Sequence, residues 1–150
     1  MTVSDRAFPS IMEATKEMCV FARAREITDS LGSRLKVSVE AQPEGATVTL
    51  ERPDLRGRPR ARLDAYGAEV LWGYIMAARL AAPGQLADEC TDGSCATRLR
   101  LTCEPRPAIC VIQADLERPF EIAATFWDQL YAELCLVIAH VRQLDRRLAA

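Results

Sequence analysis

Hydrophobic residues recur along the chain with two different periods, and this alternation predicts helices and strands in turn. Ser10 and Glu13 have the spacing of a capping box, and Gly32 can end a helix, so we predict a first helix over residues 10–32. Its apolar residues at helical spacing are Val20, Ala24, Ile27 and Leu31. Residues 36–41 and 47–52 alternate as strands do, and the link that ends in Gly45 suits a hairpin turn. The residues expected to face inward from this hairpin are Val37, Val39, Val48 and Leu50.

The middle of the chain predicts a short edge strand followed by a helix. Residues 52–62 are polar and contain two prolines, which allow only an edge strand there. Asp64 can cap a helix over 65–82 that ends at Pro83 and Gly84. Its expected buried stripe comprises Val70, Leu71, Tyr74, Ile75 and Ala78. Because Trp72 and Met76 make the opposite side apolar as well, this helix is expected to be central or to form an interface.

The last third predicts a second hairpin and a long helix. Residues 97–103 and 108–115 read as strands joined around Pro105–Pro107, and a helix is expected over 120–148. Spacings of three and four residues separate its apolar positions Trp127, Leu130, Leu134, Val137, Val141, Leu144 and Leu148. Tyr131 and Ile138 widen this stripe, which favours packing on a sheet over a two-stranded coiled coil.

Together these elements predict one α+β domain over residues 1–150, an antiparallel sheet with helices packed on it. The expected order is α-β-β-(β)-α-β-β-α. A shift of 64 residues superposes Glu40 on Glu104, Pro43 on Pro107 and Asp64 on Asp128, which suggests a weak internal ββα duplication.

In element order and size, though in no motif, the chain resembles the small, acidic, dimeric class I type III secretion chaperones. Its order is also similar to that of the roadblock-type profilin-like domain. Fold analogy of this kind does not carry function, so we identify no family from it.

The charge and hydropathy of the chain argue against several classes of binding partner. The net charge of −2 and the pI near 5.5 give no bias toward nucleic acid or an anionic membrane. The N-terminus lacks the basic and apolar regions of a secretory signal, and the apolar run 70–82 is too short to span a membrane and contains Arg79. We therefore expect a cytoplasmic protein without a membrane partner.

Four of the six cysteines lie within residues 90–110. Their spacing is compatible with a metal site, a redox-active pair, or a hairpin in which cysteine serves as a small hydrophobic residue. Cys90, Cys95, Cys103 and Cys110 could form a zinc site at a hairpin end, although their separations are looser than those of usual zinc ligands. With a two-residue tip, Cys103 faces Cys110, and Leu99 and Leu101 point inward; a three-residue tip turns Ile109 and Val111 inward instead. In either register Cys103 is expected to be a buried small hydrophobe.

The other cysteines divide into two groups. Cys19 and Cys135 lie among apolar neighbours on predicted helices and are expected in the core. Cys90 and Cys95 flank a polar loop, so this pair could oxidise or bind metal and act as a sensor.

A basic stretch offers a second candidate site. Arg56, Arg58, Arg60 and Arg62 recur at period two, so an extended chain would present them on one face to phosphate or an acidic partner. Acidic flanks and the lack of interleaved aromatic residues favour a solvated edge strand protected by charge over a nucleic-acid site.

No constellation for catalysis or for a cofactor can be assembled from the sequence. The chain has no G-x-G loop, no Walker A motif and no G-x-S-x-G elbow, and its one histidine, His140, is expected on a helix without a catalytic partner. We therefore expect no enzymatic activity and no cofactor.

These observations favour a non-enzymatic, chaperone- or regulator-like homodimer that holds a partner polypeptide on its sheet or helix surface. Trp72 and Met76 are the expected interface residues. The alternatives are a metal or redox sensor built on Cys90 and Cys95, and a binder of an acidic ligand or nucleic acid that uses Arg56–Arg62.

Overall fold

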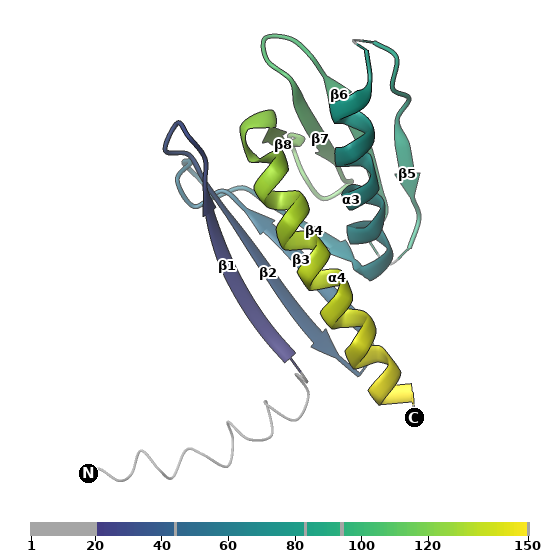
Figure 1. The fold of residues 1–150 in the computed structure, drawn as a ribbon. Coiled ribbons are helices and arrows are strands. Elements are labelled where there is room, and N and C mark those ends of the chain that lie inside the picture. The colour runs from purple at the N-terminus through teal and green to yellow at the C-terminus, as the bar shows by residue number, and fades with distance from the viewer. Residues whose placement is uncertain (1–20, 44, 83, 94, 150) are drawn as a thin grey trace, which may run out of the picture.

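The computed structural model describes residues 21–43, 45–82, 84–93 and 95–149, which form two antiparallel four-stranded sheets and two α-helices (Figure 1). This is the expected α+β class. In chain order the elements are β1 (Phe21–Thr28), β2 (Arg34–Gln42), β3 (Gly45–Glu51), β4 (Arg60–Asp64), α3 (Ala65–Leu80), β5 (Glu89–Thr91), β6 (Thr97–Thr102), β7 (Ala108–Ile112), β8 (Phe120–Ala123), the 3₁₀ turn η1 (Ala124–Phe126) and α4 (Trp127–Ala149).

The first sheet has the strand order β1-β2-β3-β4 and one apolar face. Val37 lies opposite Leu50, and Val39 lies opposite Val48, so each pair shares one face of the sheet. All four side chains are buried, as the alternating pattern predicts. Gly45 begins β3 with a φ of 138°, a backbone conformation that a residue with a side chain rarely adopts.

The prediction of a helix over residues 10–32 is wrong for its described part, because residues 21–28 form β1. Ile27 pairs with Leu35 across β1 and β2, and both side chains are buried. The Asp29 carboxylate accepts hydrogen bonds from the backbone N–H groups of Leu31 and Ser33. Gly32, with a φ of 85°, therefore belongs to a strand-to-strand turn and not to a helix end. Residues 10–20 of the predicted helix lie outside the described residues.

The second sheet, ordered β5-β6-β7-β8, contains two strands that the sequence pattern did not predict. β5 lies in a stretch expected to be a loop, and β8 occupies the expected start of the last helix. Phe120 pairs with Val111, and Ile122 with Ile109, so β8 completes the sheet before the helix begins. For this reason α4 starts at Trp127 and not at residue 120.

The hairpin between β6 and β7 has a longer connection than the two-residue tip considered above. Thr102 pairs with Ala108, Leu101 with Ile109 and Leu99 with Val111. This register turns Ile109 and Val111 toward the core, and both are fully buried. Cys110 lies opposite Arg100, so the two-residue tip, the alternative in which Cys103 faces Cys110, is wrong.

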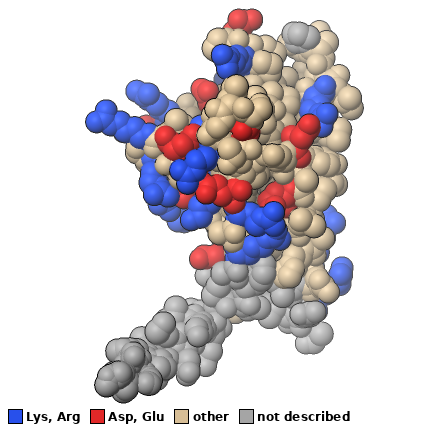
Figure 2. Space-filling view, turned by 60° about the vertical axis from the view of Figure 1, so that its left-hand side comes forward, with Lys and Arg blue, Asp and Glu red and all other residues tan. Residues whose placement is uncertain are grey.

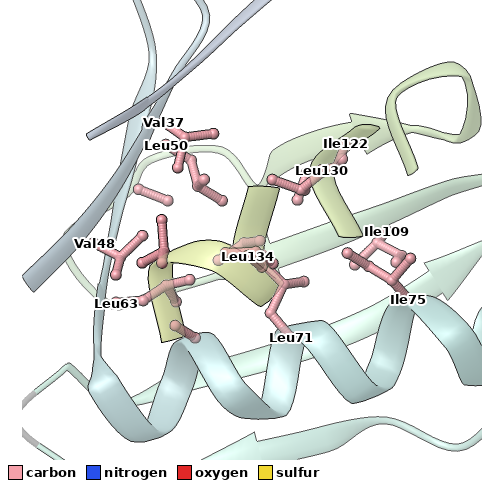
Figure 3. Close-up of a cluster of buried hydrophobic side chains, with 14 of the residues drawn as sticks. Val37, Val48, Leu50, Leu63, Leu71, Ile75, Ile109, Ile122, Leu130 and Leu134 are labelled. Carbon is pink, nitrogen blue, oxygen red and sulfur yellow. The ribbon is translucent and has the colours of Figure 1, made fainter. Parts of the chain in front are cut away.

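The two helices pack against each other and against the sheets. In Figure 1, α4 follows the second sheet in the chain but crosses in front of the first, and it contacts β2; α3 contacts β3 and β4 as well as β5 and β6. The central core combines residues of both sheets and both helices (Figure 3). These include Val37, Val48, Leu50 and Leu63 of the first sheet, Leu71 and Ile75 of α3, Leu130 and Leu134 of α4, and Ile109 and Ile122 of the second sheet.

The buried side chain of Gln113 joins the two sheets. Its amide nitrogen donates to the backbone oxygen of Arg62 in β4 at 2.5 Å and to the hydroxyl of Thr97 in β6 at 2.8 Å. Its amide oxygen accepts a longer hydrogen bond of 3.4 Å from the Arg62 N–H. The Gln113 side-chain amide therefore donates to and accepts from the backbone of β4, as a peptide group of a neighbouring strand would.

Each half of the described chain consists of four strands followed by a helix. A shift of 64 residues places β2, β3 and α3 over ranges that overlap β6, β7 and α4. A duplication of the sequence itself stays a prediction.

Candidate functional site

α3 begins where the sequence predicts, at a helix cap that also meets the loop after β5. The Asp64 carboxylate accepts a hydrogen bond of 2.6 Å from the Gly67 N–H and caps the first turn. The loop approaches the same carboxylate closely, since a Cβ atom on Gly93 would lie 2.2 Å from an Asp64 oxygen. The cap thus fixes the start of α3 and its position relative to the second sheet.

Three sides of α3 have different surroundings. One side is buried in the core through Ala68, Leu71, Ile75 and Ala78. A second side packs against α4, where Trp72 stacks on Tyr131 with 5.3 Å between ring centroids. The third side faces solvent.

This solvent-facing side of α3 carries apolar residues from end to end. Tyr66 is 62% exposed, Met76 is 36% exposed and Leu80 is 79% exposed. Val70 and Ala77 are half-buried between them, and Gly73 is exposed at the centre. We call these six residues, Tyr66, Val70, Gly73, Met76, Ala77 and Leu80, the α3 stripe. Glu69 lies on the same face of the helix, so one carboxylate interrupts the stripe. An exposed apolar patch of this kind typically marks an interaction surface.

A groove runs beside the α3 stripe and enlarges the apolar surface. It has a volume of about 380 Å³ and is bounded on one side by α3 and on the other by residues 86–89. Its apolar lining includes Val70, Ala77 and Leu86, and Glu69 and Glu89 also line it. Tyr74, whose hydroxyl donates to the backbone oxygen of Ala87 at 3.2 Å, holds the far wall against the helix.

Two of the charged residues around the stripe are paired within the chain. Glu69 forms a 2.9 Å ion pair with Arg142 of α4, and Arg79 pairs with Asp128. Beyond the groove, hydrogen bonds from Arg100 and from Arg98 lower the pKa of Asp88 below its usual value. These ion pairs offset the charges of Glu69 and Arg79 within the chain.

The two predicted interface residues have different places on α3. The indole N–H of Trp72 donates to the Cys135 sulfur at 3.0 Å, so Trp72 is half-buried against α4 of its own chain. Met76 belongs to the α3 stripe. The positions of Trp72 and Met76 in a single chain do not show whether two copies of the chain associate.

The candidate cysteines are dispersed over the second sheet and its loops. Cys90 is exposed in β5, opposite Arg98, and Cys95 is half-buried in the loop before β6. Cys103 is half-buried just after β6, so it is less covered than the expected core residue. Cys110 is buried on β7, and this burial raises the pKa of its thiol.

Two further cysteines were expected in the core. Cys135 is half-buried beside Trp72. Cys19 lies outside the described residues. Within the part of the chain that the structure describes, no group of three or more histidine, cysteine, aspartate or glutamate side chains could hold a metal ion.

The four arginines do not form the single extended face that their spacing suggests. Only Arg60 and Arg62 belong to β4, where both are exposed, and Arg60 lies opposite Glu51. Arg56 and Arg58 lie in the turn-rich segment before it, and Arg58 forms a 3.0 Å ion pair with the same Glu51. On the side of the molecule that lies to the left in Figure 1, basic and acidic residues are interspersed (Figure 2).

Arg52, which the sequence did not single out, anchors this segment. It forms a 2.9 Å ion pair with Asp54, and its guanidinium lies 5.2 Å from the ring centroid of Phe126. The hydrogen bond from Arg52 lowers the pKa of Asp54 to about 2. These contacts give Arg52 a structural role at the end of the first sheet.

The hydrophobic pattern did not single out Tyr66, Gly73 and Leu80, although they lie at helical spacing. Positions 66, 70, 73, 77 and 80 alternate steps of four and three, the period of a helix-packing stripe. Because most positions of this helix are apolar, the sequence does not distinguish its exposed side from its buried sides. The packing of the other two sides shows which side stays exposed.

The chain matches no protein-family model, and no curated protein is detectably similar to it in sequence. Among the described residues, no helix combines the length and the apolar character that crossing a membrane requires.

Proposed function

We propose that this protein is a non-enzymatic protein-binding module, chaperone- or regulator-like, that holds a polypeptide on the α3 stripe and its groove. The observation that carries the proposal is the row of exposed apolar side chains on the solvent side of α3, with Leu80 79% exposed. Leaving such side chains in water is unfavourable, and covering a leucine-sized side chain contributes about 1.5–3 kcal/mol.

The shape of the surface favours a polypeptide over a small ligand. The stripe runs from Tyr66 to Leu80 of α3, so it extends over about 21 Å. The groove beside it is open along the helix and is lined mainly by aliphatic and small side chains. An elongated apolar surface of this form suits a helix or an extended segment with apolar residues at regular spacing. The proposal includes the cytoplasmic location expected from the sequence.

A photo-crosslinking amino acid in place of Met76, introduced in living cells, tests this proposal. We expect adducts with a polypeptide, identified by mass spectrometry. The matched control carries the same amino acid in place of Glu40, which is exposed on the first sheet far from the stripe in the chain. If position 76 yields no more protein adducts than position 40, α3 is not a polypeptide-binding surface.

A further inference from the structure

We propose that the outer edge of β1 and a basic hollow beside it bind an acidic polypeptide segment, which pairs with β1 as an added strand. β1 is the first strand in the order β1-β2-β3-β4, and no other strand of the described residues pairs with its outer edge (Figure 1). This surface belongs to the first sheet and contains no residue of the α3 stripe. The inference therefore does not depend on the proposed function.

The backbone groups of alternate β1 residues face away from β2. The Asp29 N–H donates to the Ser33 oxygen, and the antiparallel register continues from this pair along the whole of β1. Because inward and outward residues alternate in such a ladder, the N–H and C=O groups of Ala24, Glu26 and Thr28 point away from β2. An unpaired strand edge is a template for a further strand, and an extended polypeptide supplies the matching row of donors and acceptors.

A basic hollow of about 230 Å³ adjoins this edge, and its charged lining consists of Arg25, Glu26, Arg34, Lys36 and Arg58. The Glu26 carboxylate pairs with Arg34 at 2.5 Å, and Arg58 pairs with Glu51 at 3.0 Å. Within the described part of the chain, no acidic side chain forms an ion pair with Arg25 or Lys36. On a chain whose net charge is −2, the hollow thus keeps unpaired positive charges, which favour an acidic segment.

The arginines of β1 disfavour a second copy of β1 as the added strand. Arg23 and Arg25 share one face of β1, and Arg23 is already paired with Glu133 of α4 at 2.6 Å. In the two registers that pair most residues of two antiparallel β1 strands, Arg25 lies opposite Arg23 or opposite its own copy. In either register Arg25 gains an arginine as its neighbour, which is destabilising, whereas an acidic strand gives it a carboxylate.

Nucleic acid also suits this surface less well than an acidic polypeptide. The phosphate backbone offers no donors to the outward C=O groups of a strand edge, so it leaves half of the row without partners. No aromatic side chain on which a base could stack lines the hollow. Backbone pairing and charge together therefore favour the polypeptide.

Selection of random peptides displayed on phage, with the purified full chain as the target, tests the inference first. Peptides of about ten residues are long enough to span β1. We expect the enriched peptides to carry aspartate or glutamate at alternate positions, because alternate side chains of an added strand lie on the side of the hollow. No enrichment, or enrichment of peptides without acidic residues, would overturn the inference.

Substitutions at the exposed Ala24 then test the backbone pairing, with the most enriched peptide labelled with fluorescein and its binding followed by fluorescence anisotropy. Ala24→Pro removes an outward N–H group and blocks close pairing, so it should raise the dissociation constant at least about tenfold. Ala24→Thr keeps the N–H group and is the matched control, which should bind as the unchanged protein does. Circular dichroism should show both variants folded, since proline is tolerated in an edge strand where the N–H faces solvent. Equal binding by the two variants would contradict an added strand.

Lys36→Glu tests the charge of the hollow. It should raise the dissociation constant of the acidic peptide about fivefold or more, because an attraction becomes a repulsion. The loss should shrink at high salt, which screens exposed charges. An unchanged dissociation constant would contradict the role of the hollow. A labelled single-stranded DNA that binds more tightly than the peptide, and equally to Ala24→Pro, would assign the hollow to nucleic acid instead.

Crosslinking and sedimentation separate this inference from the proposed function and from a second copy. A photo-crosslinking residue in the selected peptide should form adducts with β1 or β2. Adducts on α3 in place of β1 would contradict this inference and support the proposed function, and adducts confined to residues 1–20 would also contradict it. A dimer of the unchanged chain that Ala24→Pro dissociates would show that a second copy occupies the edge, and would overturn the acidic segment as its partner.

Discussion

The joint that Gln113 makes between the two sheets should contribute measurably to stability, and Gln113→Leu is the substitution that tests it. Leucine has a similar volume and fits an apolar neighbourhood, so the change removes hydrogen bonds with little loss of packing. Two of the bonds are short, at 2.5 Å to the Arg62 oxygen and 2.8 Å to the Thr97 hydroxyl, whereas the bond from the Arg62 N–H is long at 3.4 Å.

The expected loss follows from these three bonds. A typical intramolecular hydrogen bond contributes about 1 kcal/mol net, and a buried group left without a partner costs about 1–3 kcal/mol. A depression of about 310 Å³ lined by Arg62, Cys95 and Gln113 adjoins the joint, so water can reach part of it. The Thr97 hydroxyl also keeps its own bond to the Cys95 oxygen. The free energy of unfolding should therefore fall by about 2 kcal/mol, less than the loss of all three bonds together with an unpaired buried group would give.

Urea denaturation followed by circular dichroism measures this loss. With a slope near 2 kcal/mol per molar urea, the midpoint should fall by about 1 M. Gln85→Leu is the control, because Gln85 is exposed in the loop after α3 and the change there should be within about 0.5 kcal/mol. A loss of less than about 0.5 kcal/mol for Gln113→Leu would refute the reasoning that this side chain joins the sheets.

Three further predictions concern the cap of α3, the thiols and acid stability. Asp64→Ala should lower the free energy of unfolding by about 1 kcal/mol, because it removes the helix cap. Gly93→Ala should destabilise the unchanged protein but have little effect in the Asp64→Ala background, where the close carboxylate is missing. Additive losses in the double variant would contradict a shared site. In timed alkylation followed by mass spectrometry, the exposed Cys90 should react before the buried Cys110, whose thiol pKa is raised by burial, and the reverse order would show that this part of the sheet opens readily. The arginine-bound Asp54 has a pKa near 2 in place of 3.8, so its stabilising contribution is present above about pH 4 and is lost as the pH falls toward 2; the Asp54→Asn variant should lack that part of the acid dependence in thermal unfolding, and an identical profile would contradict it.

The strand pattern of the first hairpin and the two long helices could be predicted from the sequence, because each is a local property. Val37 and Val39 alternate with polar residues, and a period of two places them on one face wherever the strand pairs. Asp64 predicts the start of α3 by the capping bond that its own carboxylate makes three residues ahead. The apolar stripe of α4 predicts its buried side through Leu130, Leu134 and Val141.

The strands β1, β5 and β8 were decided by tertiary structure. Residues 21–28 have apolar positions compatible with a helix, and pairing with β2 makes them extended, since a strand forms its backbone hydrogen bonds with a neighbouring strand and not within itself. The three residues of β5 are too few to show a period. Residues 120–123 adjoin a strongly helical stripe, and their pairing with β7 overrides it.

The α3 stripe likewise depends partly on the sequence and partly on the tertiary structure. The sequence by itself determined that α3 is apolar on most of its circumference. It could not determine which side stays uncovered, because that depends on the sheets and on α4, whose Tyr131 and Cys135 cover Trp72. Burial is a property of the assembled fold, so the side left to solvent, with Tyr66, Gly73 and Leu80 on it, exists as a surface only once the other two sides have been packed.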